Sequence, residues 1–341
     1  MRAARPGPSR AHRRVSEPLD TVGAVIDYGR FAERLAARTD RWGLLVEFQR
    51  EWGYIGAINR GFEGADADGD EFEGEDDGDG GDEDEPCPVV PAALTEWYAL
   101  PQNSFMHAAT LYWTHPHMPP TRWPATEDLA EIGLPAERLE PVPGRSGVFM
   151  AEYEYCWTWS YLEREAALDP DPPVYLADTE RHGRELERVL IGERRHARYQ
   201  AARSLSEWVL AFAVTAIPFN IAQVANGPDE LRPGQIDHAL VAGLAAWEGA
   251  GLSAEERDRV RETFPELGLL PWIGFGCYEL RGGPDVVMML RTELPDVPED
   301  GGEYDLLIAA RSSEALELAL DRLGLGDAQR RTAEVGVRPE G

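Results

Sequence analysis

The residues best suited to metal binding are three histidines in one stretch of the chain. His107, His115 and His117 offer imidazole nitrogens, and the His-Pro-His spacing of the last two resembles that of some zinc sites. However, Pro116 and the prolines at 119–120 make this stretch a stiff loop, and neither a cysteine nor an acidic ligand lies close in the sequence. We therefore expect ordinary loop histidines and no bound metal.

A second candidate for ion binding is the acidic segment of residues 62–85, in which 14 of 24 positions are Asp or Glu and none is Arg. The fragment from Asp66 to Glu71 is similar to the start of a calcium loop, but an EF-hand would need Gly in place of Glu71 and Glu in place of Asp77. So polar a segment cannot offset its ordering entropy by burial. We predict a disordered, solvated acidic loop, with specific calcium binding as the alternative.

Motifs for nucleophilic or phosphoryl-transfer catalysis are missing from the sequence. All 33 basic residues are arginine, so the lysine of a Walker A loop is not available. The stretch 144–147 has the wrong spacing for a nucleophile elbow. Carboxylates are too abundant for any pair to stand out as an acid–base couple. We expect no catalytic residues and no cofactor.

Composition narrows the class of partner. The 341 residues carry a formal net charge of −29, which disfavours nucleic acid, because affinity for phosphate backbones comes largely from cationic side chains. A basic protein partner is the natural complement. Cys87, Cys156 and Cys277 are odd in number and widely spaced, which argues against a disulfide framework or a zinc cage and fits a reducing cytoplasm.

The hydrophobic pattern along the chain predicts both helices and strands. The apolar stretch 208–221 is interrupted by Pro218 and Asn220, short of the roughly 20 apolar residues of a membrane span, so we expect a buried helix and no membrane. Other helices are expected at residues 31–54, 181–203 and 239–247, from the capping-type start at Ser253 onward, and at 312–323, where Gly324 ends the helix. Strands are expected at residues 278–280, 286–291 and 304–309.

One further strand, residues 152–161, has an unusual aromatic face. Five aromatic residues alternate there with small or acidic ones, which places the aromatics on one side of a strand. They are Tyr153, Tyr155, Trp157, Trp159 and Tyr161. We expect this face to be mostly core, with a recognition surface for a partner as the alternative.

Five stretches between residues 90 and 325 occur in an order known from one family. They are a helix start at 91–98 (PAALTEWY), a strand at 148–157, the turn 171–175 (DPPVY), a helix at 204–210 (SLSEWVL) and a closing strand and helix at 306–316. Together they resemble the SUKH superfamily, which includes fungal cell-wall and killer-toxin-resistance regulators and many bacterial immunity proteins; the turn is frequent in actinobacterial members.

The resemblance implies an α+β fold with a mixed, largely antiparallel sheet flanked by helices, and no catalytic activity. The resemblance assigns residues 86–325 to a SUKH-like α+β domain. From composition and pattern we predict, outside it, a disordered Arg-rich tail (1–20), an N-terminal helical part of the fold (21–61), the disordered acidic loop (62–85) and a flexible C-terminus (326–341). Many bacterial relatives neutralise toxins by binding them, so we expect a cytoplasmic immunity protein whose partner is a toxin with a basic surface, such as a nuclease.

The residues expected to bind such a partner are aromatic or acidic. In the predicted strand they are Trp157, Trp159, Glu152 and Glu154, and in the acidic segment Asp76, Asp77 and Glu83. Two alternatives remain open from the sequence: an intracellular adaptor of the same fold, and a metal-dependent hydrolase.

Overall fold

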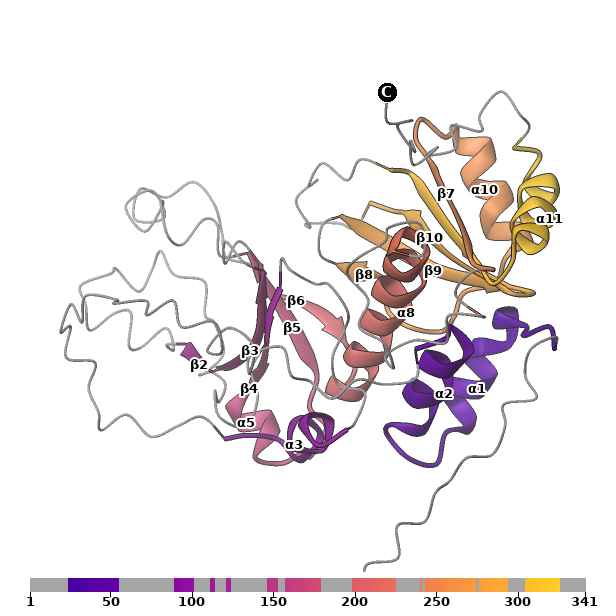
Figure 1. The fold of residues 1–341 in the computed structure, drawn as a ribbon. Helices are drawn as coiled ribbons and strands as arrows, with labels where there is room; N and C mark the ends of the chain where they lie inside the picture. The colour runs from indigo at the N-terminus through magenta and orange to yellow at the C-terminus, as the bar shows by residue number, and fades with distance from the viewer. Residues whose placement is uncertain are drawn as a thin grey trace, which may run out of the picture.

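Two antiparallel sheets, with helices packed against them, make up the fold (Figure 1). The computed structural model describes residues 24–54, 89–100, 111–113, 121–123, 146–152, 157–178, 198–224, 240, 243–273, 276–293 and 304–325. The predicted α+β class and antiparallel pairing are confirmed. The strands are divided between two sheets, however, and every pairing among the described strands is antiparallel.

The first sheet has the order β1-β3-β4-β5-β6, and β2 also pairs with β3. Its strands are β1 (Leu111–Trp113), β2 (Thr121–Trp123), β3 (Ser146–Glu152), β4 (Trp157–Leu162), β5 (Val174–Asp178) and β6 (Arg198–Ala202). The second sheet has the order β7-β11-β10-β9-β8. Its strands are β7 (Ala245–Gly249), β8 (Trp272–Ile273), β9 (Cys277–Gly283), β10 (Val286–Arg291) and β11 (Leu306–Ala310).

The helices connect and cover the sheets. They are η1 (Tyr28–Arg30), α1 (Phe31–Ala37), α2 (Gly43–Glu51), α3 (Ala92–Tyr98), α5 (Glu163–Ala166), α8 (Leu205–Val224), α10 (Ala254–Thr263) and α11 (Ser313–Leu323). Helix α8 lies between the two sheets and contacts strands of both, while α10 and α11 cover the opposite face of the second sheet (Figure 1). The second sheet is therefore covered on both faces.

Strand β10 shows how this arrangement follows from the sequence. Its alternate side chains, Val286, Met288 and Leu290, pack under α10 and α11, and the intervening Val287 and Met289 belong to the core around α8. A strand buried on both faces reads as a continuous apolar run and not as an alternating one.

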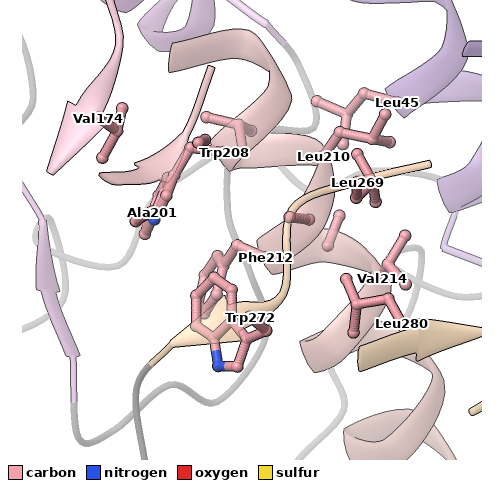
Figure 2. Close-up of a cluster of buried hydrophobic side chains, with 14 of the residues drawn as sticks. Leu45, Val174, Ala201, Trp208, Leu210, Phe212, Val214, Leu269, Trp272 and Leu280 are labelled. Atoms are coloured by element: carbon pink, nitrogen blue, oxygen red, sulfur yellow. The ribbon is translucent and has the colours of Figure 1, made fainter. Parts of the chain in front are cut away.

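The core around α8 is rich in aromatic residues. Phe212 of α8 stacks on Trp208 of the same helix and on Trp272 of β8, and Val174 and Ala201 approach from the first sheet (Figure 2). The predicted buried helix at 208–221 is thus confirmed as part of α8, which continues through Pro218. Within the described residues, no helix combines the length and the apolar character needed to cross a membrane.

Several local predictions are confirmed. Ser253 begins α10 with a complete capping box, in which its side chain accepts from the Glu256 amide and the Glu256 side chain accepts from the Ser253 amide. Gly324 ends α11 in the left-handed conformation that glycine adopts readily. Strands β9 and β10 contain the strands predicted at 278–280 and 286–291, and β11 overlaps the strand predicted at 304–309 but begins two residues later, at Leu306.

Four predictions of secondary structure are wrong. A single strand over 152–161 does not form, because β3 ends at Glu152 and β4, starting at Trp157, runs antiparallel to it. Ala245–Trp247 belong to β7 and not to a helix, because Trp247 pairs with Ile308 of β11. Residues 198–202 form β6, and the helix expected over 31–54 is broken between α1 and α2. The Arg-rich tail, the acidic segment and the C-terminal residues 326–341 lie outside the described residues.

Candidate interaction surface

Exposed apolar side chains occur on both chain segments that meet at α3 and α5. These two helices lie side by side at one end of the first sheet (Figure 1), and the amide of Ala93 in α3 donates to the carbonyl of Pro170, just after α5, at 2.9 Å. Among the described residues, five large apolar side chains are exposed, and three of them, Val89, Val90 and Leu168, flank this contact. We call these three residues, with Glu96 and residues 163–171, the α3/α5 surface.

Leu168 is the most exposed of the five, with 90% of its surface accessible. Its position is nevertheless fixed, because the amides of Leu168 and Asp169 donate to the carbonyl of Glu165 at 2.9 and 2.7 Å. Two residues after Asp169, the Asp171 carboxylate accepts hydrogen bonds from the amide and hydroxyl of Ser206 at 2.8 and 2.6 Å. These bonds connect the turn to the first turn of α8. The turn therefore holds an apolar side chain in solvent on an ordered backbone.

Negative charge surrounds these apolar side chains. Four of the nine residues 163–171 are acidic and one is basic. On α3, Glu96 accepts from Arg41 at 2.6 Å and from the indole nitrogen of Trp42 at 2.9 Å. The hydrogen bond from Arg41 lowers the pKa of Glu96, so this carboxylate is charged at neutral pH. Arg41 neutralises Glu96, but Asp169 stays exposed.

Carboxylates elsewhere in the fold are held by arginines and serve the structure. Burial alone would raise the pKa of Glu279, but hydrogen bonds from Arg261 and Arg281 outweigh burial and lower it. Asp305 accepts from the amide of Leu252 at 3.0 Å and from Arg257 at 2.7 Å, and so fixes the segment before α10. Pairing of this kind favours structural roles over acid–base catalysis.

Glu207, in the first turn of α8, differs from Glu279 because burial dominates its pKa. Only 5% of its side chain is exposed, and its carboxylate lies 3.5 Å from the guanidinium of Arg203. Burial raises the pKa of Glu207, although the positive charges of Arg203 and Arg38 act in the opposite direction. Folding therefore places a carboxylate where its ionised form is disfavoured.

We expect Glu207→Gln to become more stable relative to the wild type as pH rises. Because the pKa of Glu207 is raised by folding, its contribution to stability is fully present below the unfolded value and is lost as pH rises through the folded value. The free energy of unfolding of both proteins, measured in urea from acidic to neutral pH, tests this. Glu96→Gln is the matched control with the opposite sign, because the lowered pKa of Glu96 contributes stability that is lost as pH falls. A difference between wild type and Glu207→Gln that does not vary with pH would contradict the expectation.

Metal and thiol chemistry find no support among the described residues. No group of three or more His, Cys, Asp and Glu side chains there is arranged to hold a metal ion. Burial raises the pKa of Cys277 to about 12, so its thiol stays protonated and unreactive at neutral pH. The predicted loop histidines at 107, 115 and 117 lie outside the described residues, as do Cys87 and Cys156.

The aromatic face predicted at 152–161 belongs, where the structure describes it, to the core. Trp159 and Tyr161 are fully buried, and the ring of Trp159 lies 5.7 Å from Trp208 and 6.0 Å from Trp272. Trp159 is therefore corrected from a partner-binding candidate to a core residue, because no partner can reach its ring in this fold. Its face of β4 is covered by α8.

The other predicted contact residues are not brought together by the described structure. Glu152 ends β3 and Trp157 begins β4, and only their backbones are described. Glu154, Asp76, Asp77 and Glu83 lie outside the described residues. Sequence reasoning missed Leu168, because no pattern around it distinguishes an exposed leucine from a buried one.

Comparison with protein-family models, with curated proteins and with solved structures finds no significant match. What the chain does has therefore to be inferred from its own charge, surface and packing.

Proposed function

We propose that this chain is a non-enzymatic binding protein that engages a basic protein partner in the cytoplasm, in the manner of a SUKH-type immunity protein neutralising a toxin. The observation that carries the proposal is the charge: a net −29, with 14 carboxylates concentrated in residues 62–85. A nuclease-type toxin fits this charge best, because a nuclease needs a basic cleft to hold nucleic acid.

The electrostatic argument concerns the rate of association as much as affinity. A strongly acidic protein attracts a basic partner over distances of about a Debye length, roughly 8 Å at physiological ionic strength. Such steering speeds the diffusional encounter and discriminates against acidic partners. An inhibitor that must capture a toxin before it acts benefits directly from a fast encounter.

The α3/α5 surface adds apolar contact area to the electrostatic attraction. Protein interfaces combine a polar rim with an apolar centre, and Leu168, Val89 and Val90 offer apolar contact area among carboxylates. The order of motifs that resembles the SUKH superfamily points to the same class of function.

The direct test uses a toxin domain encoded beside this gene. Cells that express the toxin domain should grow when this chain is expressed with it and should fail to grow without it. The two purified proteins should form a complex that inhibits the toxin without consuming it. Absence of any such neighbouring gene, or a toxin that stays active in the presence of excess chain, would count against the immunity role and favour the adaptor.

Removing the charge of the acidic segment should slow association with the partner. Deletion of residues 63–85 removes all 14 carboxylates, roughly half of the net charge. We expect the association rate constant at low ionic strength to fall by about tenfold or more, and the difference to shrink as salt screens the charges. Stopped-flow or surface-based kinetics at two salt concentrations measures both effects.

A second variant separates charge from chain length. Replacing the 14 acidic residues by Asn and Gln keeps the length of the segment, so it should reproduce the slow association of the deletion. Faster dissociation at every salt concentration in either variant would instead make the segment an ordered contact element, and the steering explanation would be wrong.

A further inference from the structure

We propose that the α3/α5 surface is the docking point for a basic polypeptide segment that carries an apolar side chain, with Leu168 as the central contact. The inference rests on the proposed function, because it names the place and the chemistry of the partner that the acidic chain would bind.

The apolar part of the argument starts from where the exposed side chains lie. Leu168, with 90% of its surface accessible, stands two residues before Pro170, and the exposed Val89 and Val90 stand shortly before Ala93, so the hydrogen bond between Ala93 and Pro170 joins the two segments that carry them. Single exposed apolar residues are ordinary, but three that flank one contact form the kind of patch that marks an interface. The hydrogen-bonded turn holds Leu168 in place before binding, so little conformational entropy is lost when a partner covers it.

The negative charge of the α3/α5 surface determines which class of partner binds there. Residues 163–171 contain four acidic residues and one arginine, and Val89 follows the acidic segment after only three intervening residues. An acidic or neutral apolar surface would gain nothing from this net negative charge, whereas arginine or lysine side chains on either side of an apolar anchor would be attracted by it and would pair with the exposed Asp169. A lipid surface is the other class of occupant for an exposed leucine, but a net charge of −29 repels anionic membranes.

Two synthetic peptides test this chemistry on the full chain. Both are arginine-rich, nine residues long and equal in charge, and they differ only at the central position, which is leucine in one and serine in the other. At low ionic strength the leucine peptide should bind the wild type about tenfold more tightly than the serine peptide, the gain expected for covering one exposed leucine with another. Binding should also slow hydrogen exchange of the Leu168 and Asp169 amides.

Leu168→Ser should abolish the preference for the leucine peptide and leave the serine peptide's affinity unchanged. Leu318→Ser is the matched control, because Leu318 lies on α11, is 49% exposed and lies beside the second sheet. It should keep the full preference. Leu168→Ser should unfold at the wild-type midpoint because Leu168 is exposed, whereas Leu318→Ser should be slightly destabilised because half of the Leu318 side chain is buried.

The outcomes separate the docking point from the proposed function. Equal affinity of the two peptides for the wild type, or a preference that survives Leu168→Ser, overturns the docking point while acidic binding stands. Failure of both peptides to bind at low ionic strength overturns the proposed function itself. Binding to neutral phosphatidylcholine vesicles that is lost in Leu168→Ser would assign the patch to a membrane and overturn the protein partner.

Discussion

Replacing Arg311 by alanine is expected to lower the free energy of unfolding by about 3–5 kcal/mol, the usual cost of breaking a buried ion pair. Arg311 follows β11, and only 10% of its side chain is exposed. Its guanidinium donates to the Asp285 carboxylate at 2.7 Å and to the carbonyls of Ala24 and Glu51 at 3.1 Å each. Three distant chain segments therefore lose a shared partner, and the Asp285 carboxylate loses its counter-charge.

Asp285, the ion-pair partner of Arg311, can be replaced in a double-mutant cycle without disturbing its turn. Asp285 has a φ of 55°, and its carboxylate also accepts from the Ile26 amide at 2.9 Å. Asparagine tolerates this left-handed conformation and keeps an acceptor, so Asp285→Asn removes the charge and leaves the turn intact.

The four proteins of this cycle are compared by urea unfolding. The double variant should be less destabilised than the sum of the two single variants, because each single variant leaves one unpaired charge. A loss of unfolding free energy below about 1 kcal/mol for Arg311→Ala would be that of an ordinary surface salt bridge. It would contradict the role of Arg311 in holding the three chain segments together.

Arg311 also illustrates what the sequence alone could not predict. The capping box at Ser253 and the glycine that ends α11 involve residues within four positions of each other, so local patterns identified them. The contacts of Arg311 span about 260 positions or more to the N-terminal segment. Nothing in the neighbourhood of Arg311 indicates which of the acidic residues it meets.

The wrong prediction at Ala245–Trp247 has the same origin. An alanine-rich stretch favours a helix by propensity, but propensity is worth only tenths of a kcal/mol per residue. Pairing of β7 with β11 and burial of Trp247 in the core under α10 and α11 outweigh it. The aromatic alternation at 152–161 likewise carried no sign of the chain reversal between β3 and β4, because no Gly or Pro interrupts it.

The sequence was sufficient to predict the charge of the partner, but not which residues form the candidate site. The net charge and the acidic segment indicated a basic partner from the sequence alone. The choice between Trp159 and Leu168 as a contact residue depends on burial, which arises from the packing of α8 on the first sheet. The aromatic alternation indicated a core face, which the burial of Trp159 and Tyr161 confirms, but nothing in the sequence indicated that Leu168 is exposed.

Replacing Trp208 by alanine is expected to cost about 3–5 kcal/mol of unfolding free energy, because it removes a large buried side chain from the centre of the core. Trp208 is fully buried, and its ring lies within 6 Å of Phe149 and Trp159 in the first sheet and of Trp272 in the second. The lost side chain would leave a cavity between the two sheets. Urea unfolding followed by far-ultraviolet circular dichroism measures the loss.

Trp208→Phe separates the effect of volume from that of the indole nitrogen. The buried indole nitrogen of Trp208 donates to none of the described residues, so phenylalanine sacrifices no hydrogen bond there and keeps the stacking with Phe212. We expect less than half of the alanine penalty for this variant. Equal losses in both variants would show that the indole nitrogen, and not the ring volume, is what matters at this position.

The number of unfolding transitions provides a second test of the role of Trp208 in coupling the two sheets. Because Trp208 contacts aromatic rings of both sheets, the cavity in Trp208→Ala weakens the packing that couples them. Wild-type unfolding should be a single cooperative transition, and the alanine variant should approach two transitions, one for each sheet with its helices. A single sharp transition in Trp208→Ala, shifted by less than about 1.5 kcal/mol, would mean that the sheets are held together elsewhere, and the central role of Trp208 would have to be abandoned.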